Sequence, residues 1–290
     1  MTFAKRLWLA FRAAKDLGIA QTCHYARYQL TLRSGLTERM SRKALERALS
    51  GARGVGFQPF LELPSVYSLR VVLGDQVGAL LDEAEEICAG KMRVFGSQVM
   101  ELRVPPKKTD LWFTQIERSL NRSENEDFDL KMVWEAARFG WVYPLARAYR
   151  LQSQERYAER FWEEIESFLE NHPPYYGFQW LSAQEVALRL IAWAFGFQVF
   201  RGASSSTEKR QQRLLEALAI HAARIPSTVH YAFAQNNNHL LSEAVGLMTA
   251  GRVLAEHPLA RSWWQQGWTW FVIGLQRQIA EDGTYVQHST

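Results

Sequence analysis

The sequence predicts an all-α protein built as an incomplete (α/α) toroid of helical hairpins. From residue 127 onward, six segments with helical periodicity follow one another, separated by breakers such as "ENHPPYYG", "RGASSS" and "AEHP". One segment, "SAQEVALRLIAWAFGFQVF", is apolar on nearly every side, whereas "RYAERFWEEIESFLEN" has a charged face and an apolar stripe. Alternation of buried and half-exposed helices is typical of a two-layer toroid, and an irregular helical bundle would give a similar pattern.

The predicted elements can be placed in order along the chain. Residues 3–50 have the patterning of surface helices, and residues 73–90, "LGDQVGALLDEAEEICAG", are also helical. Residues 51–106 form a small irregular and β element, because "KMRVFGSQVMELRVPP" has the β-branched and aromatic content of a short strand pair. We divide the chain into an N-terminal helical and mixed segment, 1–106, and a toroid domain, 107–290, joined as one continuous domain. The later helices are predicted at roughly 129–150, 154–171, 181–201, 207–224, 237–255 and 260–281.

The composition indicates a globular protein with an anionic partner. The chain has 290 residues and 47% hydrophobic content, enough to bury a substantial core, and its net charge is +4. An anionic glycan and nucleic acid would both suit this charge. We expect no nucleic acid, because the chain lacks a Lys/Arg block, zinc-ligand spacing and RNP-like motifs. Its two cysteines, Cys23 and Cys88, are too far apart for a metal cluster, and we expect no cofactor.

The N-terminal segment "MTFAKRLWLAFRAAKDLGIA" begins like a signal peptide but does not continue as one. Arg12, Lys15 and Asp16 interrupt any apolar core, so the segment is predicted to be an amphipathic helix. No stretch is long and apolar enough to predict a membrane span. A cytoplasmic location is the default expectation, with the periplasm as the alternative if the start is misassigned.

The stretch "NNNHLLSEAVGL" places polar residues at the start of a helix. With Asn236 or Asn237 as the N-cap, Asn238 and His239 fall in the first turn, where free N–H groups and the positive helix dipole converge. That field favours a neutral imidazole, which still donates one hydrogen bond, and Asn238 adds an amide donor. Glu243 lies one turn after His239 and can orient it. The pattern therefore predicts an anion site, and a simple helix cap with a satisfied histidine is the alternative.

Two stretches, "WEAARFGW" and "WLSAQEVALRL", share a Trp followed by a Glu and an Arg. Glu135 with Arg138, and Glu185 with Arg189, can pair on one helix face, and the second pair lies in an apolar helix. Such a buried pair is usually architectural. The alternative is that Arg138 or Arg189 faces a cavity and binds a carboxylate. Trp180, which opens the second stretch, is a candidate for stacking on a sugar or for core packing.

The C-terminal stretch "EDGTYVQHST" predicts a helix end, a glycine turn and an extended segment. Tyr285 and His288 are candidate proton-transfer groups in this segment. Alternatively, Tyr285 is simply a turn residue and His288 a tail residue, without a role in proton transfer.

Five stretches together resemble the heparinase II/III-like polysaccharide lyases, which include related alginate lyases. Individually they are moderate signals, and their combined order over most of the chain is specific. They are "YARYQLTLRSGL" (25–36), "DLKMVWEAARFGW" (129–141), "GFQWLSAQEVALRLIAW" (177–193), "NNNHLLSEAVGL" (236–247) and "DGTYVQHS" (282–289).

The resemblance implies a fold and a reaction. Proteins of that family have an N-terminal α/α toroid and a C-terminal antiparallel β-sandwich with a cleft between them, and this chain resembles the first part. The missing sandwich is therefore an expected partner. The implied reaction is β-elimination on a uronic-acid polysaccharide, in which Asn238 and His239 match the residues that neutralise the substrate carboxylate. The family's proton-transferring Tyr would lie beyond Thr290, so its role is not assigned to Tyr285.

The remaining site candidates follow from this implied reaction. We expect the 290-residue chain alone to fold without lyase activity, because it would lack that Tyr and the sandwich. The candidates for contacting the anionic polymer are Asn237, Glu243, Arg138, Trp180, Tyr285 and His288.

Two other function classes suit the same residues. The chain can be a carbohydrate-binding or scaffold toroid without chemistry. It can also be a toroid glycoside hydrolase, which would use two carboxylates drawn from Glu135, Glu185, Glu243 and Asp282.

Overall fold

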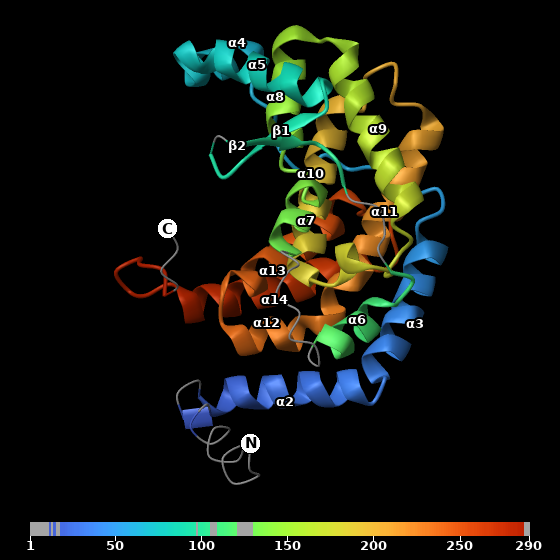
Figure 1. The fold of residues 1–290 in the computed structure, drawn as a ribbon, viewed down its shortest axis with the longest axis vertical. Coiled ribbons are helices and arrows are strands. Elements are labelled where there is room, and N and C mark those ends of the chain that lie inside the picture. Colours follow the sequence, from blue (N-terminus) through green and yellow to red (C-terminus); the bar gives the residue numbers. More distant parts are fainter. Residues whose placement is uncertain are drawn as a thin grey trace.

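The computed structural model describes residues 12, 14–15, 18–96, 98–104, 109–120 and 130–286 (Figure 1). Within these ranges the protein is helical apart from one two-stranded antiparallel sheet, as the sequence predicts. None of the described helices combines the length and apolarity needed to cross a membrane. The helices are α2 (Ile19–Arg33), α3 (Leu36–Gly51), α4 (Val66–Leu73), α5 (Val77–Cys88), α6 (Phe113–Leu120), α7 (Leu130–Ala137), α8 (Val142–Gln152), α9 (Glu155–Asn171), α10 (Ala183–Phe200), α11 (Glu208–Arg224), α12 (Val229–Gln235), α13 (Asn238–Val253) and α14 (Ala260–Gln278), and the strands are β1 (Lys91–Val94) and β2 (Gln98–Glu101).

The predicted helices of the second half agree with α9, α10, α11, α13 and α14 to within a few residues. One predicted helix, 129–150, is divided into α7 and α8, because Phe139 adopts a left-handed conformation (φ 58°) that ends the first helix. The predicted strand pair is present, with Lys91 opposite Glu101. The short helices α6 and α12 were not predicted, because eight and seven residues give too little periodicity to recognise.

Helix α10 lies at the centre of the core, as its sequence predicts. It packs against α8, α11 and α13, and nearly all of its residues are buried. Helix α9 lies outside it, with a buried aromatic stripe that includes Phe161 and Phe168. The charged face of α9 is paired, since Glu159 and Glu166 both accept hydrogen bonds from Arg210 of α11. The alternation of covered and half-exposed helices therefore follows the hydrophobic pattern.

Helices α13 and α14 form the closest helix pair of the described fold. A Cβ on Gly251 would lie 2.6 Å from the carbonyl oxygen of Ala260, and one on Gly267 would lie 2.6 Å from that of Ala244. Only glycine allows this approach. Nε2 of Gln278, at the end of α14, also donates to the Asn237 carbonyl at 2.8 Å, so α14 holds the beginning of α13 as well.

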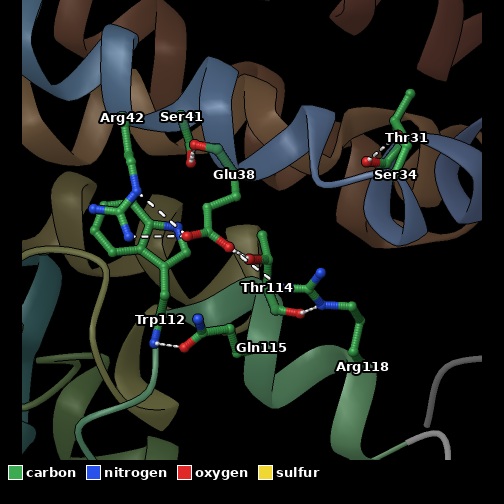
Figure 2. Close-up of polar contacts among 9 residues, drawn as sticks. All are labelled: Thr31, Ser34, Glu38, Ser41, Arg42, Trp112, Thr114, Gln115 and Arg118. Carbon is green, nitrogen blue, oxygen red and sulfur yellow. Dashed lines mark hydrogen bonds and ion pairs between the residues drawn. The ribbon is translucent and has the colours of Figure 1, made fainter.

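Helix α2 lies along one side of the molecule, against α12 and close to α6 (Figure 1). Glu38 links its own helix, α3, to α6 (Figure 2). Its carboxylate accepts hydrogen bonds from Arg42 at 2.9 Å, from the Thr114 hydroxyl at 3.1 Å and from Arg118 at 3.3 Å. The Arg42 guanidinium also lies 4.1 Å above the Trp112 ring. These contacts fix the position of α6 and therefore the side chains that it directs into the interior.

The predicted pairing of Glu185 with Arg189 is wrong. Glu185 accepts hydrogen bonds from Arg138 instead, at 2.6 Å from Nε and 2.9 Å from Nη2. The predicted pairing of Glu135 with Arg138 is present. Because α7 ends beside the first turn of α10, Arg138 reaches both carboxylates, which the order of residues along one helix could not reveal.

Arg189 is fully buried and bonded to neutral acceptors. Its Nε donates to Nε2 of His221 at 2.8 Å, Nη1 to the carbonyl of Ala137 at 3.2 Å, and Nη2 to the carbonyl of Gln179 at 3.0 Å. Since Arg only donates, His221 is the acceptor at Nε2, and its Nδ1–H donates to the Ala217 carbonyl at 2.7 Å. Arg189 is therefore architectural and is not available to a ligand.

Substitution of Arg189 by Ala should destabilise the fold by about 3 kcal/mol or more, because three buried acceptors lose their donor. The measurement is urea unfolding followed by circular dichroism, with Arg201→Ala as the control, since Arg201 is exposed at the C-terminal end of the same helix. Equal unfolding midpoints for the two variants would contradict the assigned role of Arg189.

Candidate functional site

A pocket of about 330 Å³ opens where the helices from both halves of the chain converge. Its walls come from α2, α6, α7, the beginning of α10, α12 and α13. They carry three carboxylates, two cations and two tyrosines. The lining residues are Tyr28, Glu117, Lys131, Trp134, Arg138, Leu181, Ser182, Ala183, Gln184, Glu185, Thr228, Tyr231, His239 and Glu243.

The three consecutive asparagines have different backbone roles. Asn236 ends α12 in the left-handed conformation (φ 47°), which turns the chain into the next helix. Asn237 is the N-cap of α13, and its Oδ1 accepts a hydrogen bond from the His239 N–H at 3.1 Å. Its carbonyl accepts from Gln278 Nε2 at 2.8 Å. Asn238 occupies the first helical position and is exposed, whereas His239 lines the pocket.

His239 is half-buried at the pocket wall, with its ring 6.1 Å from that of Tyr231. Burial lowers the pKa of His239, and the negative charge of Glu185 opposes the shift only in part. The imidazole is therefore neutral at pH 7 and donates through one nitrogen. The sequence predicts this neutral state from the helix dipole, and in the folded protein burial produces it.

Glu243 is on the same wall, one helical turn after His239, and only 2% exposed. Burial raises the pKa of Glu243 to about 8, although the charge of Arg224 lowers it. A carboxyl group with this pKa is protonated at pH 7 and can donate a hydrogen bond. Its Oε2 has no partner among the described residues, and no hydrogen bond joins its side chain to that of His239. The expected orientation of His239 by Glu243 is therefore not observed.

Tyr28 and Glu117 belong to the site and were not predicted as functional residues. The Tyr28 hydroxyl donates to Oε1 of Glu117 at 2.5 Å. Burial raises the pKa of Glu117, while the Tyr28 hydrogen bond and the Arg224 charge lower it, and burial together with Glu117 raises the pKa of Tyr28. Tyr28 falls within "YARYQLTLRSGL", which could have indicated it, whereas Glu117 belongs to the unpredicted helix α6.

Arg138 faces the pocket, as one of the two sequence interpretations predicts. Its guanidinium is held by Glu135 and Glu185, which orient it. Lys131, two turns earlier on α7, lines the same wall. The pocket therefore combines two cations with neutral hydrogen-bond donors.

Trp180 and Tyr285, like Asn237 and Asn238, are not among the residues that line the pocket. Trp180 is 1% exposed and packs its ring 4.6 Å from that of His221, so it supports the core behind the pocket and does not contact a polymer. The Tyr285 hydroxyl donates to Oε1 of Gln278 at 2.9 Å, beyond the end of α14 and away from the pocket lining. His288 is outside the described residues.

Comparison with known proteins identifies the family. Residues 91–290, more than half of the chain, match the family model described as "Heparinase II/III N-terminus". The chain belongs to this family. A heparin-sulfate lyase from Bacteroides thetaiotaomicron is 28% identical over 156 residues, which are 52% of this chain and 22% of that protein. This member of the heparinase II/III family thus spans less than a quarter of the relative's length.

A solved heparinase III structure with methylated lysines has the same fold. It superposes with a TM-score of 0.54 at 19% identity, covering 90% of this chain and 39% of the solved one. The likeness confirms the helical toroid that the sequence predicts.

The raised pKa of Glu243 predicts how stability depends on pH. Because its pKa is about 8 in the folded protein and near 4.5 in the unfolded chain, the folded state binds more protons between these values, and stability falls as pH rises through this window. Glu243→Gln should therefore gain stability over the wild type from pH 5 to pH 8, by a few kcal/mol in total, about 1.4 per pH unit at most. Urea unfolding at several pH values measures the difference, with exposed Glu101→Gln as the control. Parallel stability curves for Glu243→Gln and the wild type would contradict the burial of an ionisable Glu243.

Proposed function

We propose that this chain is the toroid part of a polysaccharide lyase that cleaves a uronic-acid-containing polymer by β-elimination. The proposal rests on the side of the pocket that α13 forms. There a neutral imidazole and a protonated carboxyl group, His239 and Glu243, lie one turn apart and both can donate hydrogen bonds.

These donors match the difficult step of β-elimination. The C5 proton of a uronate is next to a carboxylate, and its removal places negative charge on that group. Hydrogen bonds from neutral donors stabilise the enolate-like intermediate. Neutral donors, unlike carboxylates, do not repel its negative charge. A base then takes the C5 proton, the bond between C4 and the glycosidic oxygen breaks, a C4=C5 double bond forms, and the leaving oxygen gains a proton. In this scheme His239 and Glu243 act on the carboxylate, and Asn238, exposed at the first position of α13, adds an amide donor.

The cations of α7 suit the binding of the anionic sugar. Arg138 is fixed by two carboxylates and presents its remaining surface to the pocket, where Lys131 adds a mobile charge. Burial raises the pKa of Tyr28, which remains protonated and is a poor base. We therefore assign neutralisation and binding to the described residues and assign none of them as the proton-abstracting base.

The heparin-sulfate lyase relative supports a sulfated glycosaminoglycan as the first substrate to test. Alginate, a uronate polymer without sulfate, is the second. Both contain the C5 proton and carboxylate that the scheme requires.

A glycoside hydrolase is the second candidate function, favoured by the two buried acids. Glu243, with its pKa near 8, can serve as a general acid, and Glu185 is the nearby carboxylate of the same pocket. Glu185 is already bonded to Arg138 through both oxygens, which makes it a weaker base or nucleophile. A hydrolase would release reducing ends without the ultraviolet absorbance of an unsaturated product.

Substitution of Asn238 or His239 by Ala should lower turnover of a uronate polymer at least about 100-fold, because one donor to the developing charge is lost. Helicity should be nearly unchanged. Turnover is followed by the ultraviolet absorbance of the C4=C5 product, in the 290-residue chain and in any longer product of the same reading frame. Asn171→Ala, at the exposed end of α9, is the control. Unchanged turnover in either variant of an active protein would remove that residue from the mechanism.

A further inference from the structure

A group of basic side chains lies where α2, α12 and α14 meet, outside the pocket. Nδ1 of His24 on α2 is 3.0 Å from Nδ1 of His230 on α12, and the two rings stack with centroids 5.2 Å apart. His24 also stacks on Phe233, at 4.8 Å. The Arg277 guanidinium of α14 lies 5.7 Å from the same Phe233 ring. Three helices thus bring their basic side chains to one aromatic platform.

Among the described residues, the charges that act on the two imidazoles are positive. Burial lowers the pKa of His24, and so do the charges of Arg277 and Arg27; burial, Arg27 and His24 lower that of His230. Arg27, one turn along α2, forms no ion pair within the described part of the chain. Nη1 of Arg277 is buried and has no hydrogen-bond partner there. The cluster therefore lacks the carboxylate that usually accompanies such a concentration of charge.

This chemistry favours an anion over a metal ion. Two imidazole nitrogens 3.0 Å apart could share a cation, but Arg27 and Arg277 would repel it. In the described ranges no third His, Cys, Asp or Glu completes a metal site. An anion would instead accept hydrogen bonds from Arg277 and from protonated imidazole, and it would relieve the repulsion between the cations.

The cluster adjoins the pocket through two tyrosines. His24 lies one helical turn before Tyr28, and His230 immediately precedes Tyr231. The rings of Tyr28 and Tyr231 are 5.3 Å apart, and both line the pocket. One turn of helix spans about 5.4 Å, so the cluster lies on the same wall, next to the tyrosines.

We propose that His24, His230, Arg27 and Arg277 form an anion subsite that binds a sulfate or carboxylate of the polymer outside the pocket. The identity of the anion as part of a polysaccharide rests on the proposed function. The affinity of the subsite for a simple oxyanion does not depend on it. Since protonation of the imidazoles adds positive charge, anions should bind more tightly at pH 5.5 than at pH 7.5.

The first measurement uses inorganic sulfate and needs no turnover. The imidazole resonances of His24 and His230 are titrated by NMR in sodium sulfate and in sodium chloride at equal ionic strength. The two Nδ1 atoms share one hydrogen bond, so the imidazoles titrate as a pair. Bound sulfate stabilises positive charge on the pair, and its apparent pKa should rise by roughly half a unit or more in sulfate. An unchanged apparent pKa would overturn the subsite.

The second measurement uses a sulfated uronate oligosaccharide and calorimetry. Arg277→Gln should weaken binding about tenfold, as expected for the loss of a charge-assisted hydrogen bond worth about 1.4 kcal/mol. Arg261→Gln is the matched control, because it removes the same charge from an exposed position on the same helix, roughly 24 Å away. Thermal unfolding of both variants verifies that the fold is intact.

The outcomes separate the subsite from the proposed function. Equal weakening by the two Arg variants would overturn the subsite, since net charge alone would then account for binding. No weakening by Arg277→Gln would also overturn it. A sulfate-induced shift of both imidazoles without any binding of the oligosaccharide would support an anion site and count against the polysaccharide function.

Discussion

The pocket depends on the contacts of one buried guanidinium, that of Arg224. Its Nε donates to the carbonyl of Trp180 at 3.0 Å and its Nη2 to that of Leu181 at 2.8 Å, which fixes the chain just before α10. The guanidinium also lies 3.6 Å over the Phe113 ring of α6. Burial lowers the pKa of Arg224 only to about 10, so the charge persists in the core. Arg224 thereby joins α11 to α6 and to the segment before α10, and its charge acts on Glu117 and Glu243.

Ion pairing and burial explain how a pocket rich in carboxylates can suit an anionic ligand. Glu185 is neutralised by Arg138. Glu243, although close enough to Arg224 to feel its charge, is buried so completely that its pKa remains near 8 and it carries a proton. Glu117 is also raised in pKa by burial and accepts the Tyr28 hydroxyl. The three carboxyl groups of the pocket thus act as an ion-pair partner, a neutral donor and a hydrogen-bond acceptor, and Lys131 adds a positive charge to the same lining.

Helix α12 gives the site its second wall. It is only seven residues long, yet it carries Tyr231 toward the pocket and His230 toward α2. Asn236 ends it in a left-handed conformation, and Asn237 starts α13 within one residue. This tight junction fixes the positions of the α12 and α13 pocket residues relative to each other. Such an arrangement suits a site whose hydrogen-bond donors must hold a fixed geometry.

The sequence by itself determined the order of the longer helices, the strand pair, a cap at Asn236 or Asn237 and the position of His239 at a helix start, because periodicity and capping are local properties. The sequence also indicated a neutral His239, but it did so from the helix dipole, whereas burial is the cause in the folded protein. Tertiary structure decided the partners of the charged residues. Glu185 bonds to Arg138 and not to Arg189, and Trp180 is buried, because the approach of α7 to α10 determines which side chains meet. The protonation of Glu243 and the roles of Glu117 and Arg224 likewise depend on burial among helices distant in sequence, which no local pattern records.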